Sequence, residues 1–407
     1  MRGIMNLSFR GAALAALLFA SCVSGSHSTD PGNSNPGWGW RSAGLTASSV
    51  DLDSTAGYIN ITHVGNRLYV MDSRTLAGVR KYRMYTSLQG TTVWDSLSLP
   101  NGLSPYSWLP DSPYLYVGTE ETGDVWKYDS RTSGWTDMNT GADSGFAVQG
   151  LGMYEGGLVA CLASPNKYTR PILWNQAGNW VNLNKSGQFP ISRSFHSGLE
   201  YNGTFYAATY DTGVWTWSPS DSVWQKLADP VAQYESTVLT GKFPRALSVF
   251  HDSLYIGYFN LMGIQKIANG NTWVRADSCL AYMLADGVNS NTNCNSAVNV
   301  YALSTWNNHL ISAGYYSSVP MVYMAPTQAK AWAALGADTW KGGTTTYDMT
   351  VVGDTLYTAS WEAVWKYPLS QLDSSVKTYP AYPQYPSSSS TATAAKAMSS
   401  AALAKKK

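Results

Sequence analysis

The chain has 407 residues, of which 13% are charged and 13% are aromatic, and its formal net charge is +1 at pH 7. So many aromatic and so few charged residues exclude disorder over most of the chain. The near-neutral charge excludes an overall basic protein that binds nucleic acid through its phosphates. We therefore expect a folded protein without a nucleic-acid partner.

The first 22 residues have the pattern of an export signal. A positively charged start precedes an apolar stretch at 11–20, about half the length that a membrane-spanning helix needs. The stretch ends in FASC (19–22), which resembles the lipobox of bacterial lipoproteins. The resemblance implies that residues 1–22 are a lipoprotein signal peptide and that Cys22 carries lipid chains such as palmitate. An ordinary secretory signal is the alternative.

The residues after Cys22 predict where the protein is held. Val23 stands where an Asp would be the usual signal for retention in the inner membrane, so the resemblance implies a lipid anchor in the bacterial outer membrane or at the cell surface. Residues 23–37 are rich in Ser, Gly, Asn and Pro. This composition predicts a flexible tether between the membrane and a folded body.

One pattern recurs seven times between residues 57 and 367. An apolar stretch runs into a turn of Gly, Asn or Asp, and a Leu-Tyr-like pair opens the next apolar stretch, which is typical of a tight β-hairpin. The copies read VGNRLY (64–69), YEGGLV (154–159), YNGTFY (201–206), FHDSLY (250–255), WNNHLI (306–311), VGDTLY (352–357) and a longer LPDSPYLY (109–116).

Two further apolar stretches follow each hairpin, and the second of them carries a Trp with an apolar residue three positions later. These pairs are Trp94/Leu97, Trp135/Met138, Trp180/Leu183, Trp224/Leu227, Trp273/Ala276 and Trp332/Leu335. Four short strands per repeat of about 40–50 residues predict an all-β fold, a β-propeller. We expect seven blades over residues 38–373, with six or eight as alternatives.

The two ends of this region predict how the ring closes. The seventh repeat lacks a fourth strand with Trp, and an unmatched GWGW (37–40) precedes the first repeat. We expect the N-terminal segment around Trp38 to Leu45 to complete the last blade. Residues 374–407, rich in Pro, Ser and Ala and ending in three lysines, predict a disordered tail.

The cysteines and histidines favour structural roles. Cys279 and Cys294 bracket a long loop, and in an oxidising compartment we expect them to form a disulfide. Cys161 lies in an apolar run and is predicted to be a buried free thiol. No spacing of Cys or His indicates a metal site, and no motif indicates a cofactor.

Residues 209–215 (TYDTGVW) come nearest to a known motif, the Asp-box of sialidase-like propellers. The aromatic residue, Trp215, arrives one position early, so the chain resembles this family in architecture and only in fragments of its motif. Sialidases bind a carboxylate through three arginines. Arg193 and Arg245 lie near first strands, but no third arginine stands at a matched position. We therefore assign no catalytic residue and expect binding rather than catalysis.

The longest loops connect predicted blades and span residues 98–107, 228–244 and 277–297. In a propeller, these loops and the loops between second and third strands lie on the same face. We call it the long-loop face and expect the ligand there. One position recurs nine residues before the Leu-Tyr-like pair in every repeat except the second, which is out of register at this point. It is occupied by Ile59, Gln149, His196, Arg245, Tyr301 and Tyr347. They are predicted either to line the channel mouth or only to bind strand ends. Loop residues Tyr210, Asp211, Trp361 and Glu362 complete the candidates.

These features together predict a noncatalytic propeller, anchored at the outer membrane or cell surface, that binds a polysaccharide or an envelope protein through the long-loop face. Two alternatives remain on the same scaffold. One is a glycan-acting hydrolase, and the other is a structural component of an envelope complex.

Overall fold

The structure is a computed structural model. It describes residues 40–46, 57–76, 79–141, 145–164, 172–176, 178–184, 189, 195–209, 212–220, 222–227, 243–259, 264–268, 272–275, 299–315, 321–323, 332–335, 346–360, 363–371 and 377–378. All of them belong to one compact unit, Trp38–Lys407. The predicted signal peptide with Cys22, the tether and the cysteines of the predicted disulfide lie outside the described residues.

The described strands form seven antiparallel sheets, which we number in chain order. The first four are β2 (Gly57–Val64), β3 (Arg67–Leu76), β4 (Val79–Leu88), β5 (Asp95–Leu97); β6 (Pro105–Asp111), β7 (Tyr114–Thr119), β8 (Val125–Asp129), β9 (Gly134–Asp137); β10 (Ala147–Tyr154), β11 (Gly157–Ala163), β12 (Ile172–Gln176), β13 (Asn179–Asn182); and β14 (Phe195–Tyr201), β15 (Thr204–Thr209), β16 (Gly213–Ser218), β17 (Val223–Lys226).

The last three sheets follow the same plan. They are β18 (Phe243–Phe250), β19 (Ser253–Phe259), β20 (Ile264–Ala268), β21 (Thr272–Arg275); β22 (Asn299–Trp306), β23 (His309–Tyr315), β24 (Met321–Tyr323), β25 (Trp332–Ala334), β29 (Lys377–Thr378); and β26 (Thr346–Val352), β27 (Thr355–Ser360), β28 (Ala363–Pro368) with β1 (Arg41–Thr46). Two short 3-10 turns, η2 (Pro100–Gly102) and η4 (Leu369–Gln371), complete the described elements.

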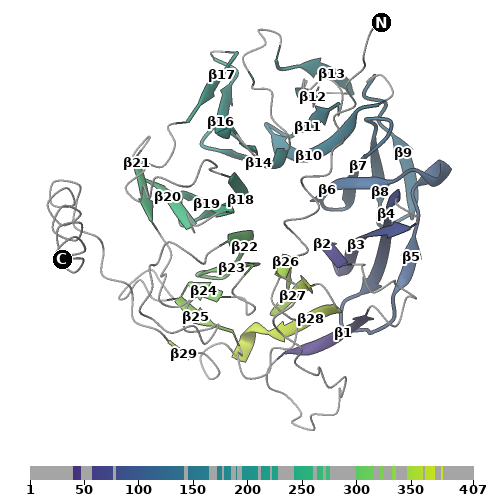
Figure 1. Cartoon of the computed structure of the whole chain (residues 1–407), viewed down its shortest axis with the longest axis vertical. Helices are drawn as coiled ribbons and strands as arrows, with labels where there is room; N and C mark the ends of the chain where they lie inside the picture. Colours follow the sequence, from purple (N-terminus) through teal and green to yellow (C-terminus); the bar gives the residue numbers. More distant parts are fainter. Residues whose placement is uncertain are drawn as a thin grey trace, which may run out of the picture. The chain divides into compact units, whose positions relative to one another are not determined.

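Consecutive sheets pack against one another through their apolar faces (Figure 1). Each first strand lies beside the next one, from β2 and β6 through to β26, and β26 lies beside β2. The contact between sheets is too close for side chains at some positions: a Cβ on Gly150 would lie 2.1 Å from Phe195 in the next sheet, and one on Gly257 would lie 2.4 Å from Val300 in the next sheet. The predicted all-β propeller fold is confirmed, and Cys161 is buried and forms no disulfide, as predicted.

A hydrogen bond from each of several fourth-strand tryptophans explains the Trp-containing motif. The indole N–H of Trp94 donates to the carbonyl of Ala43 (2.9 Å), that of Trp180 to Met138 (2.8 Å) and that of Trp224 to Leu183 (3.2 Å). Each acceptor stands three residues after the tryptophan of the preceding sheet. Because Met138, Leu183 and Leu227 also donate their own N–H groups to the third strand of their sheet, the motif joins strands and sheets together.

The N-terminal strand belongs to the last sheet. Strand β1 pairs with β28, and Trp40, only 5% exposed, donates its indole N–H to the carbonyl of Leu335 in the sixth sheet. Its ring centroid lies 5.1 Å from that of Tyr367. Trp40 therefore occupies the fourth-strand position for which the seventh repeat has no tryptophan of its own.

The C-terminal segment departs from its prediction at two residues. Lys377 and Thr378 form β29, which pairs with Ala334 and Ala333 of β25 and adds a fifth strand to the sixth sheet. The prediction of a disordered tail from residue 374 onward is therefore wrong for β29. The Ser- and Pro-rich composition of the segment does not indicate which two residues can pair with the exposed edge of β25.

Candidate functional site

Every first strand carries a β-bulge near its start, and in six of the seven strands the extra residue is one that the repeat singled out. The extra residues are Ile59 in β2, Tyr106 in β6, Gln149 in β10, His196 in β14, Arg245 in β18, Tyr301 in β22 and Tyr347 in β26. A bulge leaves its extra residue without a cross-strand partner and redirects the side chain. Because all seven bulges lie where the chain enters a sheet, they gather on the long-loop face.

Tyr106 is the member that the sequence analysis missed. The second repeat is in register at this position, since counting nine residues back from Leu115 reaches Tyr106, the bulge residue of β6. The longer turn of that repeat hides the match. The ring of Tyr106 packs edge-on against Tyr82 at a centroid distance of 5.6 Å.

Three bulge residues from neighbouring sheets touch one another, and we call them the Arg-Tyr-Tyr arc. The guanidinium carbon of Arg245 lies 3.9 Å from the ring centroid of Tyr301, and the rings of Tyr301 and Tyr347 meet edge to face at 5.6 Å. All three side chains are half-buried. A cation on a tyrosine face is attracted by the ring quadrupole, so the arc is held in shape by its own members.

Asp348 follows the last bulge residue and joins the seventh sheet to the first. Its Oδ2 accepts a hydrogen bond from the backbone N–H of Ile61 at 3.0 Å, and its Oδ1 accepts one from Met349 at 2.8 Å. Burial raises the pKa of the Asp348 carboxyl to about 7, although these two hydrogen bonds and the charge of Arg245 oppose the rise. A carboxyl beside the arc thus changes charge near neutral pH.

Gln149 has the structural role that the sequence analysis left open. Its Oε1 accepts a hydrogen bond from the backbone N–H of Phe195 in the next first strand, at 3.3 Å. Ser107 makes a similar link by donating to the carbonyl of Val148 at 2.6 Å. At these two junctions, polar side chains tie neighbouring first strands together. His196 is half-buried at its bulge.

Hydroxyl groups recur at the end of second strands, four residues after the first residue of the Leu-Tyr-like pair. Thr119, Thr209 and Ser360 donate across the following turn, to the carbonyls of Asp124, Gly213 and Ala363. Thr209 begins the segment that resembles an Asp-box. In the structure, the hydroxyl of this segment stabilises the turn between two strands.

Asp72 stands at this position in the first sheet, and the sequence analysis did not single it out. Its side chain is fully buried, and its carboxyl oxygens have no hydrogen-bond partner in the described part of the chain. Burial raises the pKa of Asp72 to about 6, against the opposing charge of Arg83. The carboxyl is therefore stabilised in its neutral form.

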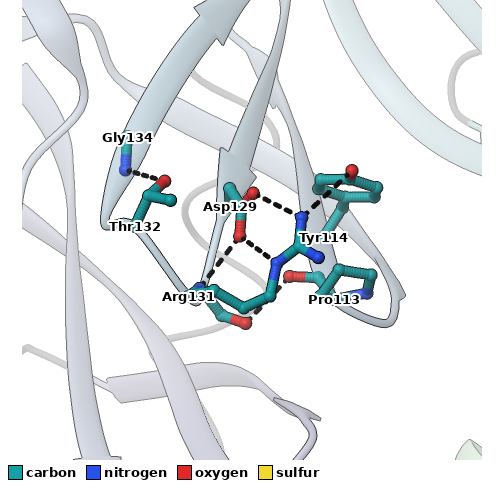
Figure 2. Close-up of polar contacts among 7 residues, drawn as sticks. Pro113, Tyr114, Asp129, Arg131, Thr132 and Gly134 are labelled. Carbon is teal, nitrogen blue, oxygen red and sulfur yellow. Dashed lines mark hydrogen bonds and ion pairs between the residues drawn. The ribbon is translucent and has the colours of Figure 1, made fainter.

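The opposite face carries tight turns and an exposed polar cluster (Figure 2). Arg131 makes an ion pair with Asp129 at 2.8 Å and donates to the hydroxyl of Tyr114 at 3.3 Å. The hydrogen bonds from Arg131 hold the pKa of Asp129 at about 2. Since these side chains are exposed to water and salt, the cluster shapes two turns and adds little stability.

The remaining candidates lie outside the described residues: Tyr210, Asp211, Trp361 and Glu362. Among the residues that the structure describes, no group of three or more His, Cys, Asp or Glu side chains is placed to hold a metal ion. Within the same residues, no helix has the length and apolar character to cross a membrane.

No protein-family model matches the chain, and no curated protein matches its sequence. Among solved structures, it is similar to the extracellular domain of the proposed hybrid two-component system BT4673 from B. thetaiotaomicron, with a TM-score of 0.54 and 11% identity over 81% of this chain and 40% of that chain. The extracellular domain of the proposed hybrid two-component system BT3049 from the same organism is also similar. Its TM-score is 0.52, with 13% identity over 78% of this chain and 40% of that chain.

The WD40 β-propeller domain of Doa1 is also similar, with a TM-score of 0.51 and 13% identity over 81% of this chain and 96% of that domain. The chain spans about two fifths of the length of the two bacterial structures. At these identities the likeness shows the fold alone, so the chain is a β-propeller protein whose structural neighbours include bacterial extracellular domains.

Proposed function

We propose that the chain is a noncatalytic binding module whose ligand, a polysaccharide, docks on the long-loop face at the channel mouth. The observation that carries this proposal is the Arg-Tyr-Tyr arc, in which bulges of three consecutive sheets bring a cation and two aromatic rings together. Tyrosine rings with half-exposed faces and a polar tip suit contact with sugars. The sequence predicts that four further residues lie in loops of the same face, and we propose that they extend this surface: Tyr210, Asp211, Trp361 and Glu362.

The proposal includes a seven-bladed ring that is closed by the N-terminal strand. The seven sheets, the pairing of β1 with β28 and the side-by-side packing of β26 and β2 support it. A closed ring would hold the bulges at fixed distances around the mouth, because each sheet is then packed on both faces.

We further propose that the propeller is exported and held by a lipid on Cys22 at the outer membrane or cell surface. The lipobox resemblance and the tether-like composition of residues 23–37 support this location. The extracellular domains among its structural neighbours agree with it.

The test is binding of the full chain to an array of bacterial, plant and host polysaccharides, with mass spectrometry of any bound glycan after incubation. We expect at least one polymer to be retained without cleavage, and Tyr347→Ala to abolish retention. Tyr114→Ala, a tyrosine of the opposite face, is the matched control and should bind as the wild type does. Cleavage of a retained polymer would refute a noncatalytic role. Equal losses in both variants, or no retained polymer, would refute the proposed face.

A further inference from the structure

We infer that Asp72 and Arg83 form a pH-dependent switch in the β3–β4 hairpin: the neutral carboxyl of Asp72 lies buried between two sheets, and the ionised carboxyl turns outward and pairs with Arg83. The inference concerns the conformation of the first sheet and stands apart from the proposed ligand. It rests on the burial of Asp72, on the strand register and on the length of the hairpin.

The first observation is the side of the sheet that Asp72 faces. Successive residues of a strand point to opposite faces. Leu68 and Val70, which precede Asp72 at intervals of two residues, belong to the apolar core between the first and seventh sheets. Met71 belongs to the core between the first and second sheets. Asp72 therefore continues an apolar row that faces the seventh sheet.

The second observation is that this position suits a neutral carboxyl. Asp72 is 0% exposed, and within the described part of the chain neither carboxyl oxygen has a hydrogen-bond partner. A carboxylate that is buried without hydrogen bonds is strongly disfavoured. Burial accordingly raises the pKa of Asp72 to about 6. The buried form is therefore stable in acidic solution and becomes costly as the pH approaches neutrality.

The third observation is a cation directly across the strand pair. The register of β3 and β4 places Arg83 opposite Asp72, and the Cβ atoms of such a pair lie about 4.5–5.5 Å apart. Arg83 is exposed to solvent, and its charge opposes the effect of burial on the pKa of Asp72. Rotation of the Asp72 side chain therefore brings the carboxylate to a guanidinium without a change in register. Two residues further along, the register pairs Arg74 with Lys81.

The other titratable groups of this junction do not replace Arg83. Burial, together with the charge of Asp72, raises the pKa of the Tyr85 hydroxyl on β4. Burial likewise raises the pKa of Tyr357 on β27, so neither hydroxyl ionises near neutral pH. Three further groups complete the set: Tyr58, opposite Asp72 on β2; His63, hydrogen-bonded to Thr350; and Asp348, hydrogen-bonded to Ile61. Because Asp348 also titrates near neutral pH, the experiment must separate it from Asp72.

The fourth observation is the length of the hairpin that contains the switch. In three other sheets the second strand ends at the position of Asp72, with Thr119, Thr209 or Ser360. In the first sheet the pairing of β3 with β4 continues to Leu76 and Val79. Tyr82, the neighbour of Arg83, packs edge-on against Tyr106 of the second sheet. A rearrangement of the Asp72–Arg83 pair thus acts on the stem of the longest hairpin among the described strands.

Hydrogen exchange of the full chain at pH 5 and pH 8 tests the switch. The readout is the protection factor of peptides from β3 and β4, the ratio of the exchange rate of an unstructured peptide to the observed rate at the same pH. The wild type, Asp72→Asn, Arg83→Gln and the double variant form a double-mutant cycle, which isolates this pair from Asp348. We expect no measurable coupling at pH 5 and a coupling of roughly fivefold in the protection factor at pH 8.

The exposed pair of Asp129 and Arg131 is the matched control. The pKa of Asp129 is held at about 2 by the hydrogen bonds from Arg131, so this carboxyl is ionised at both pH values. The cycle of Asp129→Asn and Arg131→Gln, measured on peptides from β8 and β9, should therefore give the same coupling at pH 5 and at pH 8. Circular dichroism checks that each variant is folded.

Three results would overturn the inference. No coupling between Asp72 and Arg83 at either pH would show that the carboxyl stays buried and does not reach the arginine. Equal coupling at both pH values would show a permanent ion pair and no switch. A loss of protection at pH 8 that persists unchanged in Asp72→Asn would assign the pH response to another group. None of these results depends on polysaccharide binding, so each leaves the proposed function intact.

Discussion

Replacement of Trp40 by phenylalanine tests whether the N-terminal strand closes the ring. The change removes the indole N–H that donates to the carbonyl of Leu335, a fully buried residue. A net hydrogen bond contributes about 0.5–1.5 kcal/mol, and leaving a buried acceptor unsatisfied raises the cost to about 1–3 kcal/mol. The smaller ring also loosens the packing against Tyr367 and Leu369, so we expect the upper half of this range.

The assay is urea unfolding of the full chain, followed by circular dichroism so that the loss of a tryptophan does not alter the signal. Trp224→Phe is the matched control, because Trp224 makes the same kind of bond to Leu183 between two sheets in the middle of the chain. We expect the two variants to lose similar free energies of unfolding. Trp40→Ala also leaves a cavity, so its free energy of unfolding should fall by about 3–5 kcal/mol.

One result would refute the reasoning. If Trp40→Phe and Trp40→Ala unfold at the wild-type urea concentration while Trp224→Phe unfolds earlier, the N-terminal strand contributes nothing to stability. The last sheet would then be stable with three strands, and the hydrogen bond from Trp40 to Leu335 would be incidental.

Three further predictions concern stability. The pKa of Asp348 is raised to about 7 in the fold, so the free energy of unfolding of the wild type should fall as the pH rises from about 4 to 7. Urea unfolding at several pH values should show a smaller fall for Asp348→Asn, and an equal fall in both proteins would contradict this prediction. Gly198→Ala should reduce the free energy of unfolding by about 1–3 kcal/mol because the new methyl group crowds Phe205. Gly134→Ala, at the exposed start of β9, should have a smaller effect, and thermal unfolding compares the two variants. Thr209→Val should cost about 1–2 kcal/mol by removing its turn hydrogen bonds, and an unchanged urea midpoint would show that these bonds contribute nothing.

The fold was predictable because each repeat must cover the faces of its neighbours in the same way. Repeated turns and Leu-Tyr pairs indicate hairpins, and the Trp motif marks a fourth strand at a constant place. The unmatched tryptophans before the first repeat predicted the N-terminal strand, and Trp40 has the contacts of a fourth-strand tryptophan. The two-residue strand β29 left no comparable signal, since its pairing depends on an open edge and not on its own composition.

The positions of the candidate site were predictable, and its contacts were not. Counting from the Leu-Tyr pair reaches Arg245, Tyr301 and Tyr347 because strand pairing fixes the register. Their mutual contact depends on how the sheets twist and on which way each bulge turns its side chain, which no spacing records. Asp72 went unnoticed because the residue at its position varies between repeats, and its burial follows from packing between sheets.

The bulges separate the residues that pair the strands of the propeller from the residues that would contact the proposed ligand. Each bulge residue is skipped by the register of its strand pair, so strand pairing constrains its identity less than that of its neighbours. Seven such positions have diverged into one aliphatic, one amide, one imidazole, one guanidinium and three phenol side chains. Specificity in such a scaffold can therefore change one blade at a time, by substitutions that leave the backbone ladders of all seven sheets in place.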